Sequence, residues 1–138
     1  NVINFIKKLH HNKKNVYLVS GGFEPLIFPC AEILDIPFTN VIANKFIHNP
    51  ENGEYLSFDK TCFTSKTGGK RNALNYIQEK NSINGSCSMV MIGDGITDLE
   101  AKPPADIFIG YGGVTERKIV KEKSDYYVKD FQELIDII

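Results

Sequence analysis

The feature that most constrains this chain is a short apolar run that stops at a glycine-rich polar turn and is followed by a helical pattern. Residues 88–92 (SMVMI) stop at Gly93-Asp94-Gly95, and residues 16–19 (VYLV) stop in the same way at residues 20–22 (SGG). Apolar runs of this length without alternation are typical of strands buried on both faces of a parallel sheet. The sequence therefore predicts buried parallel strands whose carboxyl ends carry polar groups.

Helix and strand patterns alternate along the rest of the chain, which favours an α/β fold built on a mainly parallel sheet. We expect helices over residues 2–12, 23–35, 68–80, 115–122 and 131–138, with a short one from 96 to the Pro103-Pro104 pair. We expect strands over residues 16–19, 39–43, 88–92, 106–109 and 126–128. Pro29 should kink its helix, and Thr115 is a suitable N-cap. A hairpin with strands at 46–47 and 54–58 makes residues 44–60 an insertion in this single domain.

Length, charge and cysteine use exclude several classes of protein. With 138 residues, 42% of them hydrophobic, the chain fits one domain with a real core. A net charge of −1 argues against a nucleic-acid partner. No apolar run approaches the length that spans a membrane, and no secretory signal pattern is visible at the start. The three cysteines form no recognisable disulfide or zinc pattern, so we expect a cytoplasmic protein.

The polar groups at the carboxyl ends of the predicted strands are the candidates for function, because open α/β sheets bind ligands at that edge. Asp94 lies between two glycines at a strand end, where its carboxylate can reach a hard cation such as Mg²⁺. Asp98 can brace that site or share the cation. The structural alternative is an Asp-Gly turn followed by a Thr97/Asp98 helix cap.

Three further segments can contact an anion. Ser20, Gly21 and Gly22 lie between a strand and a helix, where backbone N–H groups favour negative charge, although a plain glycine turn would look the same. Lys70 starts a predicted helix, a position that is unfavourable for a cation unless an anion lies nearby. Arg117 follows the glycine-rich segment 110–113 and can present a guanidinium to phosphate or carboxylate. For both cations the alternative is a solvated surface residue.

In their order and spacing, these motifs resemble the phosphoserine phosphatases of the haloacid dehalogenase (HAD) superfamily. The matching segments are "VYLVSGGFEPLI", "IPFTNVIANKF", "NGEYLSFD", "TGGKR", "MVMIGDGITDLEAKPPADIFIGYGG" and "DFQELI". The resemblance covers nearly the whole chain. It implies a Rossmann-like three-layer α/β/α fold and a Mg²⁺-dependent hydrolysis of O-phospho-L-serine to L-serine and phosphate, the last step of a serine biosynthetic route.

The resemblance also assigns roles to the candidate residues. Ser20, Gly21 and Gly22 match the phosphate-binding second motif, and Lys70 matches the third-motif lysine that neutralises phosphate charge. Asp94 matches the fourth-motif Mg²⁺ ligand, and Asp98 matches the second acid of that motif, which supports the lysine. Thr97 and Arg117 match residues near the substrate. With Mg²⁺, these groups would supply positive charge and directed donors for phosphoryl transfer.

The chain departs from the family at the first motif. No Asp-x-Asp occurs in the sequence, although that motif supplies the family's nucleophile and its general acid/base. We therefore expect the chain to represent only the C-terminal portion of such an enzyme, a partial HAD-like domain over residues 1–138 that is inactive alone.

The absent first-motif strand would lie between the strands at 16–19 and 88–92, and its loss exposes two edges of unpaired backbone groups. We expect that an N-terminal segment or a second chain fills the slot, that the two strands pair directly, or that the chain is unstable alone. Two other functions stay open at this point. One is a non-catalytic module that binds phosphate or a partner, and the other is a HAD phosphatase for another small phosphomonoester.

Overall fold

The structure is a computed structural model of the 138-residue chain, and it describes residues 1–82 and 87–138. Its helices are α1 (Val2–His11), α2 (Glu24–Ile33), α3 (Gly69–Asn81), α4 (Ile96–Leu99), α5 (Lys118–Lys123) and α6 (Phe131–Ile135), with 3-10 turns η1 (Phe38–Asn40) and η2 (Phe63–Ser65). Its strands are β1 (Leu18–Phe23), β2 (Val41–Asn44), β3 (Phe46–His48), β4 (Tyr55–Phe58), β5 (Val90–Gly93), β6 (Ile107–Tyr111) and β7 (Tyr126–Val128). None of the helices in these ranges is long and apolar enough to cross a membrane.

The strands form two parallel sheets and one hairpin. β1 pairs with β2, and β5, β6 and β7 pair in that order, all of them parallel. β3 and β4 form the antiparallel hairpin expected from the sequence. The carboxyl ends of β5 and β6 lie side by side, because Gly93 is in register with Gly110. The predicted α/β class with a mainly parallel sheet is confirmed.

Successive residues of the strands point to two separate cores. In β2, for example, Val41 and Ala43 belong to one cluster with α1, α2 and α6, whereas Ile42 packs into the other with α3 and the chain around α4 and α5. The same alternation holds in β5, where Met91 and Ile92 face opposite clusters. Each cluster draws residues from both parallel sheets. The two sheets therefore form one central layer between two helical layers, the α/β/α arrangement that the family resemblance implies.

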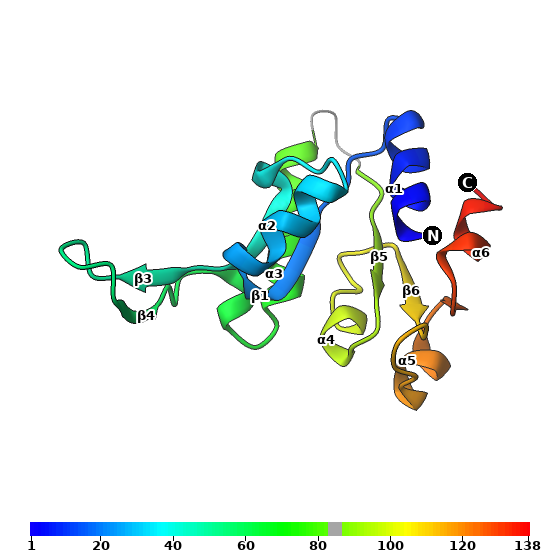
Figure 1. Cartoon of the computed structure of the whole chain (residues 1–138). Helices are drawn as coiled ribbons and strands as arrows, with labels where there is room; N and C mark the ends of the chain where they lie inside the picture. The colour runs from blue at the N-terminus through cyan, green and yellow to red at the C-terminus, as the bar shows by residue number, and fades with distance from the viewer. Residues whose placement is uncertain (83–86) are drawn as a thin grey trace.

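That central layer is divided between β1 and β5. In the described ranges β1 is hydrogen-bonded to β2 alone and β5 to β6 alone, so each has one unpaired edge (Figure 1). Val90 of β5 is 54% exposed, which is unusual for a strand in the middle of a parallel sheet. Direct pairing of the two strands, one of the three outcomes expected above, is not what the structure shows.

β1 differs from its predicted bounds at both ends. It starts at Leu18 rather than residue 16 and continues through the glycines to Phe23, so these glycines do not break the strand. The register shows why: Val19 lies opposite Ile42 and Phe23 lies opposite Asn44, so two extra residues of β1 are accommodated in a bulge. Bulges re-aim backbone groups next to functional sites. Here the bulge contains the Ser20-Gly21-Gly22 segment.

One prediction about a helix end is wrong, and one about a kink stays a prediction. Pro29 lies inside α2, which runs from Glu24 to Ile33 as one helix. Thr115 does not cap α5: that helix begins at Lys118, and its N-cap residue is Arg117, which makes no capping hydrogen bond through its side chain. Arg117 is therefore at the helix start rather than one turn inside it.

The hairpin projects away from the layered body (Figure 1). Its base is fixed by an aromatic stack, because the rings of Phe46 in β3 and Phe23 in β1 lie 3.9 Å apart and nearly parallel. Its turn contains Gly53 with φ of 72°, a left-handed conformation that glycine adopts without strain. Tyr55 and Leu56 are more than half exposed along the hairpin.

Candidate active site

The turn after β5 holds a buried carboxylate in a tight backbone loop. Asp98 is 5% exposed, and its Oδ2 accepts a hydrogen bond of 3.0 Å from the Gly95 backbone N–H. A Cβ added to Gly93 would overlap the Asp98 carboxyl group, so the loop closes only because residue 93 has no side chain. The helix-cap alternative considered for Asp98 is therefore real: this side chain does cap α4.

The same carboxylate forms an ion pair with the first turn of α3. Lys70 Nζ lies 2.5 Å from Asp98 Oδ1, and only 19% and 7% of the two side chains are exposed. The position of Lys70 in the helix is unfavourable for a cation, and Asp98 supplies the anion that offsets it. Two residues that are 28 positions apart in sequence thus meet at the carboxyl edge of the sheet. Because a lysine that is mostly removed from water needs a compensating charge, this pair is built into the fold.

Asp94 has a different environment from Asp98. Its side chain is 49% exposed, and its Oδ2 accepts a hydrogen bond of 3.1 Å from Arg117 Nη1. The guanidinium is 44% exposed, so water screens this pair more than the Lys70–Asp98 pair. The fold thus brings Asp94 and Arg117 together from opposite ends of the β5–α5 segment, and leaves the Asp94 carboxylate accessible.

The Ser20-Gly21-Gly22 bulge presents a hydroxyl and an exposed backbone turn. The Gly22 N–H donates to Ser20 Oγ at 3.0 Å, so the hydroxyl proton of Ser20 stays free to donate elsewhere. Gly21 is exposed, and a Cβ added there would meet no atom within 4 Å. β1 contacts both α3 and η2, and the bulge lies toward the carboxyl end of β1. In the described residues, no hydrogen bond joins this bulge to Lys70 or Asp94.

Thr97 is exposed on α4 and has no hydrogen bond through its hydroxyl in the described parts of the chain. It lies between Ile96 and Asp98 on the same turn, so it is adjacent to the buried carboxylate without contacting it through a hydrogen bond. Its substrate contact stays a prediction.

The carboxylates fit a magnesium ion only in part. Residues 1–82 and 87–138 contain no group of three histidine, cysteine or acidic side chains that could hold a metal. Both oxygens of Asp98 already accept hydrogen bonds, whereas Asp94 is exposed and paired with a single guanidinium. Mg²⁺ is often bound by one or two carboxylates together with water and phosphate oxygens. Asp94 fits that pattern as one ligand of an incomplete set.

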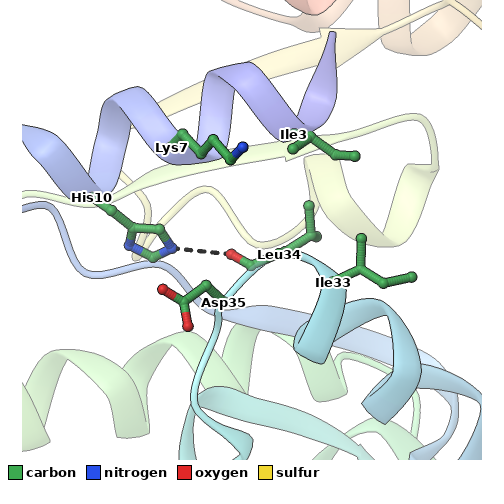
Figure 2. Close-up of a pocket in the computed structure, with 6 residues that line it drawn as sticks. All are labelled: Ile3, Lys7, His10, Ile33, Leu34 and Asp35. Carbon is green, nitrogen blue, oxygen red and sulfur yellow. Dashed lines mark hydrogen bonds between the residues drawn. The ribbon is translucent and has the colours of Figure 1, made fainter.

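A small hollow lies away from these residues. A pocket of about 150 Å³ between α1 and the end of α2 is lined by Ile3, Lys7, His10, Ile33, Leu34 and Asp35 (Figure 2). A ring nitrogen of His10 lies 3.2 Å from the Leu34 carbonyl oxygen, so this histidine is a partner in the helix packing rather than a solvated side chain. Because Asp35 precedes β2, the pocket lies toward the amino ends of the strands, not at the predicted site.

Sequence reasoning missed one polar residue at this edge. Asn44 ends β2 and is 7% exposed, and its amide Nδ2 donates to the Gly21 carbonyl oxygen at 2.9 Å. Its Oδ1 accepts from Thr64 Oγ1, also at 2.9 Å. An amide at the carboxyl end of an otherwise apolar strand is the signal that could have found it, since polar groups at this edge were the criterion applied to the other strands.

Comparison with known proteins places the chain among phosphatases. No family model matches the sequence. A phosphoserine phosphatase from Drosophila melanogaster is 48% identical over 135 residues, which cover 98% of this chain and 49% of that protein. The chain spans about half the length of the curated relatives it matches.

Solved structures with the same arrangement extend this relationship. A phosphoserine phosphohydrolase-like protein from Francisella tularensis matches 99% of the chain with a TM-score of 0.81 and 27% identity, and the match covers 61% of that protein. The structure of DsGPDH of Dunaliella salina matches with a TM-score of 0.83 and 33% identity over 99% of this chain and 22% of that protein. By sequence and by fold, the chain belongs to the haloacid dehalogenase superfamily and, within it, to the phosphoserine phosphatase family.

Proposed function

We propose that this chain supplies the phosphate-binding part of a phosphatase that hydrolyses O-phospho-L-serine to L-serine and phosphate. The observation that carries the proposal is the buried Lys70–Asp98 ion pair beside the accessible carboxylate of Asp94 at the carboxyl edge of the sheet. A cation held by a buried carboxylate is preorganised for the charge of a phosphoryl group. The sequence similarity to phosphoserine phosphatases supports this choice of substrate.

In this proposal Lys70, Ser20 and Gly21 act on the phosphoryl group. Lys70 neutralises charge on its oxygens, and the free hydroxyl proton of Ser20 donates to one of them. Gly21 brings exposed backbone close to the anion without a side chain in the way. Thr97 and Arg117 contact the rest of the substrate. The nucleophile and the general acid/base are aspartates of the Asp-x-Asp motif, which this sequence does not contain.

A magnesium ion would complete the charge balance. Asp94 would be the ligand from this chain, together with water and substrate oxygens. When bound, Mg²⁺ supplies Lewis-acid stabilisation of the phosphoryl oxygens. Arg117 holds the Asp94 carboxylate at 3.1 Å, so the guanidinium would have to yield at least part of this contact to the ion.

The completing partner is a strand between β1 and β5. Both strands have one unpaired edge, and both helical layers span the two sheets, so the position is open at the centre of the central layer. The occupant is an apolar segment that pairs with both strands and ends in Asp-x-Asp. It would come from an N-terminal segment or from a second chain. We interpret residues 44–60 as the hairpin that remains of the cap, and we keep the cytoplasmic location as a prediction.

A non-catalytic module that binds phosphate is the second candidate. Such a module needs Lys70 and Ser20 but no nucleophile. Such a module does not need an accessible carboxylate at Asp94, so the accessibility of Asp94 favours the enzyme. The two functions differ in one measurable property, which is phosphate release after the completing strand is added.

The first test is the binding of inorganic phosphate to this chain by isothermal titration calorimetry. We expect Lys70→Met to weaken phosphate affinity by about tenfold, the loss of one charge-assisted contact, worth roughly 1.4 kcal/mol. The matched control is Lys102→Met, because Lys102 also pairs with an aspartate, Asp125 at 2.6 Å, but at the opposite edge of the sheet. Equal affinity of wild type and Lys70→Met would contradict the proposal.

The second test is phosphate release from O-phospho-L-serine with Mg²⁺ and with an EDTA control. We expect this chain alone to release none, since the group that would accept the phosphoryl is absent. EDTA-sensitive release by the chain alone would show that another residue serves as nucleophile or positions water. That result would overturn the assignment of an essential missing strand.

A further inference from the structure

We propose that Asn44 and Thr64 act together as positioning residues, and that their hydrogen-bonded link sets the distance between the Ser20–Gly22 bulge and the start of α3. The inference rests on the proposed function, because it explains how two separate segments come to hold one phosphoryl group. Neither residue is predicted to touch the substrate. Their effect is on the residues that do.

The link begins with a backbone group that the bulge leaves without a ladder partner. β1 has four residue steps between Val19 and Phe23 where β2 has two, from Ile42 to Asn44, so Gly21 lies outside the regular register. The Gly21 carbonyl instead accepts from Asn44 Nδ2 at 2.9 Å. Buried backbone groups need such partners. Asn44 therefore fixes the orientation of the peptide unit between Gly21 and Gly22.

The chemistry of the contacts determines which way the Asn44 amide points. A carbonyl oxygen only accepts, so the nitrogen of the amide must face Gly21, and the oxygen faces Thr64. Thr64 Oγ1 then donates to Asn44 Oδ1 at 2.9 Å. With 7% of Asn44 exposed, water cannot easily replace either bond. The amide thus joins two segments that are more than 40 residues apart in sequence.

Thr64 transmits the position of this amide to α3. It lies in η2, and η2 packs directly against the first turn of α3. Gly69, the first residue of α3, is so close to the Phe63 carbonyl and to Thr64 that an added Cβ would overlap the backbone there. A shift of Thr64 therefore moves the start of α3, and with it Lys70. Rigid support of this kind is how a small displacement at a distance reaches reacting groups.

The experiment uses this chain with four substitutions. Asn44→Asp keeps the size of the side chain but removes the donor to Gly21, and Thr64→Val keeps the shape but removes the donor to Asn44. Thr64→Ser restores the hydroxyl. Asn40→Asp is the matched control, because Asn40 Nδ2 donates to the Val16 carbonyl at 3.0 Å near the amino ends of the same two strands. Two readouts are taken, the affinity for inorganic phosphate and the ¹H–¹⁵N amide shifts of Gly22 and Gly69.

We expect Asn44→Asp and Thr64→Val to weaken phosphate affinity by about tenfold, and Thr64→Ser to recover most of that loss. We also expect each of these two weakening variants to shift the amide signals of both Gly22 and Gly69, including the glycine that the substituted residue does not touch. Asn40→Asp should lower the melting temperature without changing affinity or either signal. The link is disproved if Thr64→Val moves only Gly69, or if Asn40→Asp weakens phosphate binding as much as Asn44→Asp.

The amide readout keeps the inference separate from the proposed function. If the wild-type chain binds no phosphate, the proposed function fails, and the joint movement of the Gly22 and Gly69 signals still decides whether the link exists. If wild type binds phosphate and the signals move independently, the proposed function stands and the link is wrong.

Discussion

At the scale of single residues, Gly93 determines whether the buried carboxylate can occupy its place. Any Cβ at this position would overlap the Asp98 carboxyl group, which also accepts from Gly95 N–H and from Lys70. We expect Gly93→Ala to push Asp98 out and to lower the free energy of unfolding by about 1–3 kcal/mol, as overpacking usually does. Urea denaturation followed by circular dichroism measures the change.

The matched control for this substitution is Gly21→Ala. An added Cβ at Gly21 meets no atom within 4 Å, and the residue has no left-handed backbone conformation, so the stability should change little. If Gly93→Ala were as stable as Gly21→Ala, Asp98 would have room to move, and its buried position would not be fixed by the turn.

Sequence reasoning named most of the polar residues at this edge of the sheet by their residue type, but it did not predict their contacts. It identified Lys70 as a cation in need of an anion, and Asp98 as a bracing acid, and the structure joins the two. Asn44 was missed because its two bonds connect segments whose proximity depends on the strand register. The bulge in β1 sets that register, and no sequence pattern near Asn44 predicts the bulge.

At the scale of elements, Asp125 joins the connection between α4 and β6, the strand β6 and the start of β7. Its carboxylate accepts from Lys102 Nζ through both oxygens at 2.6 Å and from the Phe108 N–H of β6 at 2.7 Å, just before β7 begins. The Lys102 ammonium and then the Phe108 N–H hold the pKa of Asp125 below its ordinary value of 3.8. A lowered pKa means that folding favours the charged form.

The sign of the pH dependence follows from this shift. The contribution of Asp125 to stability is fully present above about pH 4 and is lost as the pH falls through its folded pKa. We expect Asp125→Asn to be less stable than wild type at neutral pH, with the difference shrinking below pH 4. Urea unfolding at several pH values measures it. Comparison with the variant cancels the common effect of Asp59, Glu116 and Asp130, whose pKa values are lowered as well. A difference that stays constant down to the lowest pH would contradict this.

Element bounds could be predicted where the pattern was strong and local. The hairpin, the amphipathic α1 and the strand β5 follow from composition and turn residues, and the structure has all three. The errors arise where packing overrides local preference. The Ser20-Gly21-Gly22 segment predicts the end of the strand. In the structure β1 continues through this segment as a bulge, because it stays paired with β2. α2 continues past Pro29, and Ala31 beyond it is completely buried in the core.

At the scale of the whole molecule, the two halves of the central layer are joined by side chains instead of strand pairing. Across the division, Lys70 of α3 pairs with Asp98 of α4, and Arg71 Nε donates to the Glu100 carbonyl at 2.9 Å. Both helical layers also span the division. The family resemblance predicted that the sheet is divided between β1 and β5. That both helical layers still span this division could be seen only in the structure.

The last prediction concerns the unpaired edges of β1 and β5. A separate peptide with an apolar strand that ends in Asp-x-Asp should bind between them, because it satisfies both edges and binds only the folded state. We expect its addition to raise the melting temperature in a concentration-dependent way, to slow hydrogen exchange of the β1 and β5 amides, and to produce EDTA-sensitive release of phosphate from O-phospho-L-serine. The control peptide carries proline at the centre of the strand, which removes a ladder donor. Slow exchange of those amides without any peptide would mean that the edges are already paired, and the slot would not exist. Binding and protection without phosphate release would leave the strand position correct and make the chain a phosphate-binding module rather than half of an enzyme.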